Sequence, residues 1–238
     1  MQSKAVILLS TACFLASASA SGAQVYNTQT FPSRFTVGAD FAISQPKGEF
    51  ATAGIPTGYG FDVTGMLNID PKGWIALRAD GGSIRYGHEG GFIGYYGGIP
   101  LDLNTDNKIG FGSLGLQLQF PDGPLRPYAS ASYGLVRFYT QSCVSAEDNS
   151  IQDQCHTNQG DWAGATIVGG GVLIPLGTSF RLNLGARYHY GNPATYLRKG
   201  DIVDNPDGSV TLNVRSSKTD LVLWQIGFSY AIPQSTGR

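Results

Sequence analysis

Eight segments with a period of two are joined by connections that are alternately long and short. The segments are 33–43, 58–69, 74–86, 108–120, 127–139, 162–174, 179–190 and 219–232. The connections between them run about 14, 4, 21, 6, 22, 4 and 28 residues. Successive side chains of a β-strand point to opposite faces, so this period predicts strands with one polar and one apolar face. The alternating lengths predict antiparallel neighbours with every long connection at the same end.

The clearest pattern is "FRLNLGARYHYG", residues 180–191. One face carries Phe180, Leu182, Leu184, Ala186, Tyr188 and Tyr190, and the other carries Arg181, Asn183, Gly185, Arg187, His189 and Gly191. Segments 127–139 and 162–174 are rich in Gly, Ala and Ser, so their faces stay unassigned. A Gly-Gly pair at 81–82 predicts a bulge. The short connections "DPKG", "PDGPLR" and "PLGT" are typical of tight turns.

The N-terminus has the composition of a secretory signal. Lys4 precedes the apolar run "AVILLSTACFLA", and the small residues "ASASASGA" follow it. We expect a signal peptide at 1–23, cleaved near Ala20 or Ala23, and a single β domain at 24–238. A membrane anchor and a lipoprotein with Cys13 as the lipidated residue are the alternatives. No later run of eighteen apolar residues predicts a membrane-spanning helix.

Composition excludes several classes of protein. Charged residues make up 14% of the chain and its net charge is −1, which does not indicate nucleic-acid binding. The hydrophobic fraction of 42% is that of an ordinary folded chain rather than a disordered one.

Two cysteines remain once the signal is removed. Cys143 and Cys155 lie in one polar stretch of an exported chain, which predicts a disulfide across a single loop. Two free thiols are the alternative. A metal site with His156 is disfavoured because the spacing is not that of a zinc finger.

The long and short connections also bear on which face meets water. Short turns at one end, long loops at the other and an even number of antiparallel strands are typical of bacterial transmembrane barrels. The apolar faces would then meet lipid, with aromatic residues near both ends of the strands. A soluble lipocalin-like barrel or a β-sandwich, with the apolar faces inside, is the alternative.

The chain resembles the eight-stranded outer-membrane barrels of the OmpA/OmpX type. "RPYASASYGLVRF" at 126–138 is similar to the fifth strand of that family, and the likeness in architecture covers nearly all of the mature sequence. The resemblance implies an all-β, eight-stranded, antiparallel up-and-down barrel in the outer membrane of a Gram-negative-type bacterium, with both mature termini periplasmic. It also implies a monomer that contacts outer-membrane lipid and lipopolysaccharide, is inserted by the barrel-assembly machinery and holds no cofactor, metal or nucleic acid.

Such a barrel is just wide enough for side chains to fill its interior. The polar faces predict an interior network that pairs opposite charges and plugs the barrel. Its members are Arg34, Asp40, Asp62, Arg78, Asp80, Gln117, Gln119, Arg181, Arg187 and His189, with Thr64 and Asn183 among them.

We expect the function to lie in the long loops 44–57, 87–107, 140–161 and 191–218. In the last of them, "NPDG" predicts a hairpin that extends the flanking strands above the membrane. A structural or surface-interaction role is the main hypothesis, and a narrow channel and an adhesin are the alternatives. A lipid A-modifying enzyme is a further one, since "HYGN" at 189–192 is similar to a deacylase stretch. Gly191 stands where the nucleophilic serine would be, so no catalytic residue is predicted.

Overall fold

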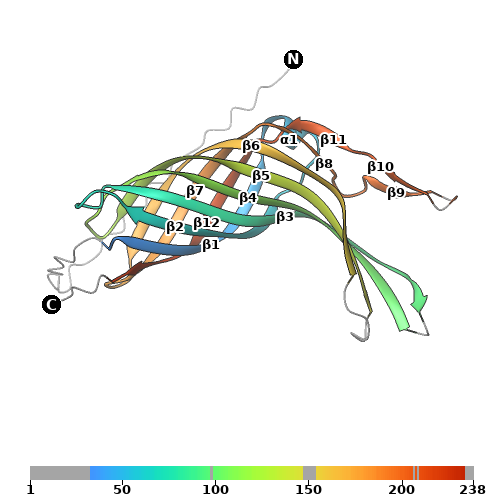
Figure 1. The fold of residues 1–238 in the computed structure, drawn as a ribbon, viewed down its shortest axis with the longest axis horizontal. Coiled ribbons are helices and arrows are strands. Elements are labelled where there is room, and N and C mark those ends of the chain that lie inside the picture. The colour runs from blue at the N-terminus through green and yellow to red at the C-terminus, as the bar shows by residue number, and fades with distance from the viewer. Residues whose placement is uncertain (1–32, 97–98, 147–153, 206, 208, 234–238) are drawn as a thin grey trace, which may run out of the picture.

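The structure, a computed structural model, describes residues 33–96, 99–146, 154–205, 207 and 209–233. Eight antiparallel strands close into one barrel in the order β1-β12-β7-β6-β5-β4-β3-β2 (Figure 1). They are β1 Phe35–Pro46, β2 Gly58–Asn68, β3 Ile75–Tyr96, β4 Ile99–Gln119, β5 Arg126–Ala146, β6 Gln154–Pro175, β7 Phe180–Gly191 and β12 Leu221–Ile232. The predicted eight-stranded up-and-down barrel is confirmed. The predicted signal peptide lies outside the described residues.

Side chains alternate between the inside and the outside of the barrel wall. In β12, Leu223 and Gln225 are buried, whereas Trp224 and Ile226 are 53% and 52% exposed. Ile226 pairs with Phe41 of β1, which is also half exposed on the outside. An apolar outer surface of this kind suits a wall that meets hydrocarbon, and the closed ring leaves no unpaired edge within it.

The three short connections lie at one end of the barrel, which we call the turn end. Each contains a glycine at positive φ, with values of 76° at Gly73, 99° at Gly123 and 127° at Gly177. Only glycine adopts this region without strain, which explains why each short connection in the sequence contains a glycine. The opposite end, which carries the long connections, is the loop end.

Four strands are longer than predicted. We expected loops at 87–107 and 140–161, but β3 and β4 stay paired as far as Tyr96 and Ile99, and β5 and β6 as far as Val144 and Gln154. Because β4 also pairs with β5 as far as Leu101 and Ala146, the four strands continue beyond the barrel as one sheet (Figure 1). Polar and glycine-rich residues suggested loops, yet strand pairing depends on the backbone.

The predicted bulge at residues 81 and 82 was wrong. Both glycines stay in register with β2 and β4. The irregularities of the β3–β4 pair lie nearer the loop end, between Arg85 and Gly87 and between Phe92 and Gly94.

The faces that the sequence left unassigned are clear in the structure. Tyr128, Val136 and Phe138 of β5 and Ile167 and Leu173 of β6 are buried inside the barrel. Tyr133, Leu135, Trp162 and Val168 of the same strands are exposed on the outside. Both faces are apolar over much of these strands, which is why hydropathy alone did not separate them.

Short elements cover the loop end. The helix α1 (Gly48–Thr52) follows β1, and β8 (Pro193–Tyr196) and β11 (Arg215–Lys218) pair directly beyond β7 and β12. A second small pair, β9 (Ile202–Asp204) and β10 (Val210–Leu212), continues outward (Figure 1). The connection after β7 therefore forms a hairpin above the barrel, as expected. Residues 206 and 208 of its "NPDG" turn lie outside the described residues.

Candidate functional site in the barrel interior

Four charged side chains meet near the middle of the barrel. Arg187 of β7 contacts Asp62 of β2, and its Nη1 lies 3.0 Å from Oδ2 of Asp80 of β3. Arg78 Nη2 lies 2.8 Å from Oδ1 of the same Asp80. All four side chains are at most 4% exposed. Burial of an unpaired charge is costly, so each ion here needs its partners to stay in place.

Neutral polar groups link these ions to the turn end. Arg78 Nη1 donates to Gln117 Oε1 at 2.6 Å, and Gln117 Nε2 donates to Gln119 Oε1 at 2.7 Å. Gln119 in turn donates to the side chain of Asn68 and to the carbonyl oxygen of Gly73. The polar network thus extends from the centre of the barrel to its turn end.

A second polar chain lies beside the first. Tyr128 of β5 donates to Asn183 Oδ1 at 2.9 Å, and Asn183 Nδ2 donates to Asp40 Oδ1 at 2.8 Å. All three side chains are buried. This chain joins β5, β7 and β1 across the barrel, so the polar side chains cross-link opposite walls.

The loop-end half of the interior is apolar. Phe50, at the centre of α1, is fully buried and makes edge contacts with Tyr86, Phe138 and Tyr196 at ring distances of 6.4, 5.7 and 5.0 Å. The other members of this cluster are Ala42, Ile55, Ile84, Ile109, Phe111, Val136, Ala163, Ala165, Ile167, Ala194, Leu221 and Leu223. The helix therefore inserts an aromatic side chain into the mouth of the barrel.

We did not predict this apolar half, because the polar faces indicated a polar plug throughout the barrel. The alternation did contain the signal. Ile84 and Tyr86 follow Arg78 and Asp80 at even spacing on β3, and Ile109 and Phe111 precede Gln117 and Gln119 on β4 in the same way. Residues of one parity share one face, so these side chains had to point inward.

The predicted interior residues other than Arg34 fall into three groups. Asp40, Asp62, Arg78, Asp80, Gln117, Gln119 and Arg187 are buried and hydrogen-bonded to one another or to neighbouring polar groups. His189 is buried against the ring of Phe111, where the polar and apolar halves meet. Arg181 is half-buried near the turn end.

Arg34 is a correction. It precedes β1 and is exposed, with its carbonyl oxygen accepting a hydrogen bond from the backbone N–H of Asn68. We applied the alternation of faces one position beyond the strand, where it no longer determines the direction of a side chain.

The structure contains the predicted disulfide. Cys143 and Cys155 are directly opposite in the β5–β6 pair, with their Cα atoms 4.0 Å apart. They lie in the part of the sheet that extends beyond the barrel, where β6 is no longer paired with β7. The bond therefore closes a hairpin rather than a loop.

Ion pairs hold the covering elements together at the loop end. The carboxylate of Asp201 accepts hydrogen bonds from Arg215 Nε at 2.8 Å and from the Arg198 backbone, and Arg198 Nη1 donates to the Ala53 carbonyl after α1. Burial raises the pKa of Asp201, but the hydrogen bonds and charges of Arg215 and Arg198 outweigh it, so its pKa is lowered overall. The carboxylate stays ionised and joins β8, β11 and the end of α1.

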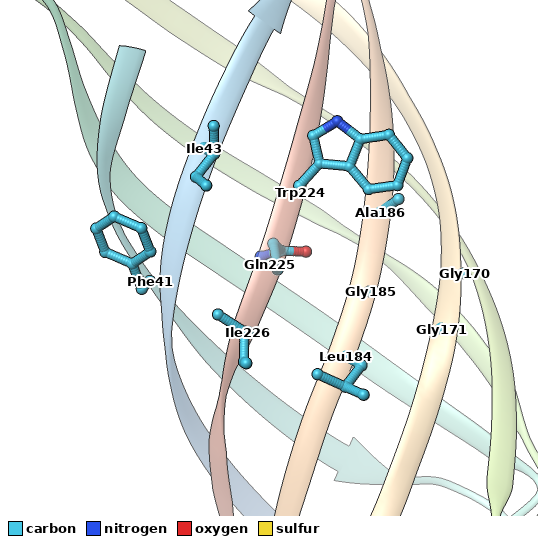
Figure 2. A pocket seen from close by; sticks show the side chains of 10 residues that line it. All are labelled: Phe41, Ile43, Gly170, Gly171, Leu184, Gly185, Ala186, Trp224, Gln225 and Ile226. Carbon is cyan, nitrogen blue, oxygen red and sulfur yellow. The ribbon is translucent and has the colours of Figure 1, made fainter. Parts of the chain in front are cut away.

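The outer wall carries a shallow apolar groove of about 450 Å³ (Figure 2). It is lined by Phe41, Ile43, Gly170, Gly171, Leu184, Gly185, Ala186, Trp224, Gln225 and Ile226. The Trp224 indole lies over β7 beside Ala186, its partner in register. No lining residue bears a hydroxyl, thiol, carboxyl or imidazole group, so the groove offers no nucleophile and no general base.

No helix among the described residues is long and apolar enough to span a membrane. No group of three or more His, Cys, Asp or Glu side chains in this part of the chain is placed to hold a metal ion.

Residues 7–230 match the family described as outer membrane protein beta-barrel domain. No curated protein matches the chain.

Several solved structures are similar to the chain. Neisserial surface protein A is 15% identical, with a TM-score of 0.44, over 84% of this chain and 98% of that one. OprG of Pseudomonas aeruginosa is 13% identical, with a TM-score of 0.46, over 84% and 96%. Ail, the attachment invasion locus protein of Yersinia pestis, is 11% identical, with a TM-score of 0.40, over 84% and 98%.

Proposed function

Because the chain belongs to the family of outer membrane protein β-barrel domains, we propose that it is a closed barrel whose function lies in the sheet that it presents outside the cell. The outer membrane of a Gram-negative bacterium is its location. The turn end then faces the periplasm and the loop end faces the exterior, as in other barrels with short turns and long loops.

One observation supports this proposal above the others, namely the length of β3 that continues beyond its pairing with β2. Within the described residues, β2 pairs with β3 only as far as Arg85, whereas β3 continues to Tyr96. At the base of this edge, the Tyr86 hydroxyl donates to the carbonyl oxygen of Leu197, and the Glu89 carboxylate accepts from the backbone N–H of Gly200. The β2–β3 register thus ends well before β3 does, while β3 stays paired with β4 as far as Tyr96.

An unpaired strand edge binds extended segments through backbone hydrogen bonds. Proteins normally protect such an edge with charges, prolines or bulges. Here the segment from Gly90 to Tyr96 contains no charged residue and no proline, and three of its seven residues are glycines. We infer that this edge takes up an extended segment of a partner on another surface, which is a surface-interaction role.

The interior supports the same proposal, because it leaves little room for transport. Paired ions and amides fill the turn-end half, and packed aromatic and aliphatic side chains fill the other. The histidine of the "HYGN" stretch is also unsuited to catalysis at the lipid surface, since His189 points inward and is buried. A closed, non-catalytic barrel that displays a binding surface accounts for both features.

A shortened hairpin tests the binding role. Glu89 and Thr105 are partners in register, so an Asn-Gly turn joining them removes the exposed edge and keeps the barrel. The matched control joins Val203 to Thr211, partners in the β9–β10 pair, in the same way. We expect cells displaying the first variant to lose adhesion to those members of a panel of immobilised proteins that the wild type binds, and the control to retain it. Equal adhesion by all three proteins would contradict the proposal.

Planar bilayers test the closed interior. We expect wild-type protein to give no stable conductance steps of porin size, because paired ions and packed rings occupy the whole length of the barrel. Steps of that size, in protein whose heat-dependent gel shift shows a folded barrel, would contradict a closed barrel without affecting the binding test.

A further inference from the structure

Three cations lie close together on the outer face of β3, β4 and β5. Arg85 is directly opposite Lys108 in register, and Arg137 is opposite Gly110, two residues further along β4. Their neighbours in sequence, among them Ile84, Ile109 and Phe138, are buried inside the barrel. The three cationic side chains therefore project outward, and we call them the cationic arc.

The cationic arc lies at the outer rim of the apolar wall. Arg85 lies ten positions after Ile75, the first residue of β3. At about 3.3 Å per residue and a tilt of about 40°, these positions span a height of about 25 Å, which is that of the apolar band in such barrels. The charges are thus placed level with lipid headgroups rather than with hydrocarbon or bulk water.

Aromatic rings hold two of the cations at this height. The Arg85 guanidinium lies 5.7 Å from the ring centroid of Tyr59, and that of Arg137 lies 5.3 Å from Tyr139 and 5.5 Å from Trp162. Tyr59 and Trp162 are 53% and 61% exposed on the outside. Contacts of this kind restrict the guanidinium groups while leaving their N–H donors free for another partner.

The positive charge of the arc is not balanced within the described chain. Asp106 is the one carboxylate in contact, with its oxygens 3.0 Å from Lys108 Nζ, 3.6 Å from Arg85 Nη1 and 2.8 Å from His88 Nδ1. Arg137 has no carboxylate within 4.0 Å among the described residues. Like charges directly opposite on neighbouring strands are destabilising, so the Arg85–Lys108 pair favours a further anion.

The opposite side of the barrel lacks such an arrangement. At the loop end of β7 and β12 the outward residues are Tyr188, Tyr190 and Val222. Among the described barrel strands, the outward cations at this height therefore lie on β3, β4 and β5, which is the pattern of a binding surface rather than of a uniform girdle.

We propose that the cationic arc binds the phosphate groups of lipid A in the outer leaflet. Arginine and lysine are suited to phosphate through charge-assisted hydrogen bonds. Phosphates of a membrane glycolipid lie at the height of the arc, and its acyl chains would lie along the apolar wall below, where Leu135 is exposed. This site is separate from the edge of β3 and does not depend on its binding role.

The test uses full-length protein in detergent micelles, with native mass spectrometry measuring the fraction that carries bis-phosphorylated lipid A. The arc variant combines Arg85→Gln, Lys108→Gln and Arg137→Gln. The matched control, Lys47→Gln with Lys199→Gln and Lys218→Gln, removes the same charge from partly or fully exposed positions at the loop end. We expect the arc variant to lose at least ten-fold in bound lipid A and the control to stay within two-fold of wild type.

A gain-of-binding variant guards against a simple loss of folding. Asp106→Asn removes the anion that competes for the cations, so it should raise lipid A binding at least three-fold. Lipid A stripped of both phosphates should bind the wild type no better than the arc variant, and millimolar inorganic phosphate should not displace lipid A. Equal losses in arc and control variants, lower binding by Asp106→Asn, or displacement by inorganic phosphate would each overturn the proposal.

Discussion

The two halves of the barrel interior are filled by different chemistry. In the turn-end half, Arg78 and Arg187 are held among Asp62, Asp80 and a series of amides. In the loop-end half, Phe50, Phe138 and their neighbours pack without a charged group between them. The boundary lies where Arg187 and His189 contact the ring of Phe111.

The two halves should therefore lose stability for different reasons when a residue is substituted. The stability of the polar half depends on the pairing of its ions, because removal of one ion leaves another buried without a counter-charge. The stability of the apolar half depends on how completely side chains fill it, because removal of atoms leaves a cavity. A variant that tests one dependence should leave the other half nearly unaffected.

We expect the largest effect in the polar half, from Arg187→Leu. It removes the cation shared by Asp62 and Asp80, which should lower the free energy of unfolding by about 3–5 kcal/mol. Urea unfolding in lipid vesicles measures it. The matched control in the apolar half, Ile167→Val, should cost about 1 kcal/mol.

A second variant separates lost charge from lost packing. Adding Asp62→Leu to Arg187→Leu removes both members of the pair, so part of the lost stability should return. If Arg187→Leu costs no more than Ile167→Val, the ions do not depend on one another as the contacts suggest.

The next largest effect should arise in the apolar half, from Phe138→Ala. Phe138 is 1% exposed and packs against Phe50 and Tyr196, so the cavity should cost about 3–4 kcal/mol. Phe138→Leu, which keeps most of the volume, should cost less than half as much in the same urea experiment. Equal costs for the two variants would mean that volume does not govern this half.

The sequence predicted the polar half better than the apolar half, and the reason is physical. A charged residue cannot face lipid at low cost, so Arg78 and Asp80 showed which face of β3 lies inside the barrel. An apolar residue is acceptable on either face. Phe138, on a strand rich in Ala, Ser and Gly, therefore did not show which face of β5 lies inside the barrel. Only the alternation relative to neighbouring polar residues could show which face of such a strand points inward.

The extended sheet outside the barrel was not predicted, for a different reason. Above the rim both faces of β3 to β6 meet water, so the alternation that marks a half-buried strand is lost. Gly91, for example, follows another glycine, a pair typical of a loop, yet it pairs with Leu103.

A third prediction compares the inside and the outside of the wall at one height. Leu184 is exposed on the outer wall and its neighbour Asn183 is buried inside. Leu184→Arg should cost roughly 2–4 kcal/mol in a bilayer because the guanidinium meets hydrocarbon. Asn183→Ser should cost less, since a hydroxyl can still accept from Tyr128.

Quenching of a fluorescent label shows which face meets lipid. In protein lacking Cys143 and Cys155, single cysteines at 182, 184 and 186 should be reached by lipid-soluble quenchers. Those at 183, 185 and 187 should not. An inverted pattern would place the polar network, not the leucines, against lipid.

The smallest effect on the barrel should come from the disulfide. Closing the hairpin between Cys143 and Cys155 should stabilise it by about 3 kcal/mol on a chain-entropy estimate. At that height β6 has left β7, since their first pair is Ala165 with Gly191, so this stabilisation is local to the extended sheet. Cys143→Ser with Cys155→Ser should therefore leave the urea midpoint of the barrel unchanged while the hairpin becomes sensitive to protease. If the midpoint falls together with protease resistance, the extended sheet and the barrel unfold as one unit, and the two halves of the interior would then have to be treated as parts of a longer cooperative structure.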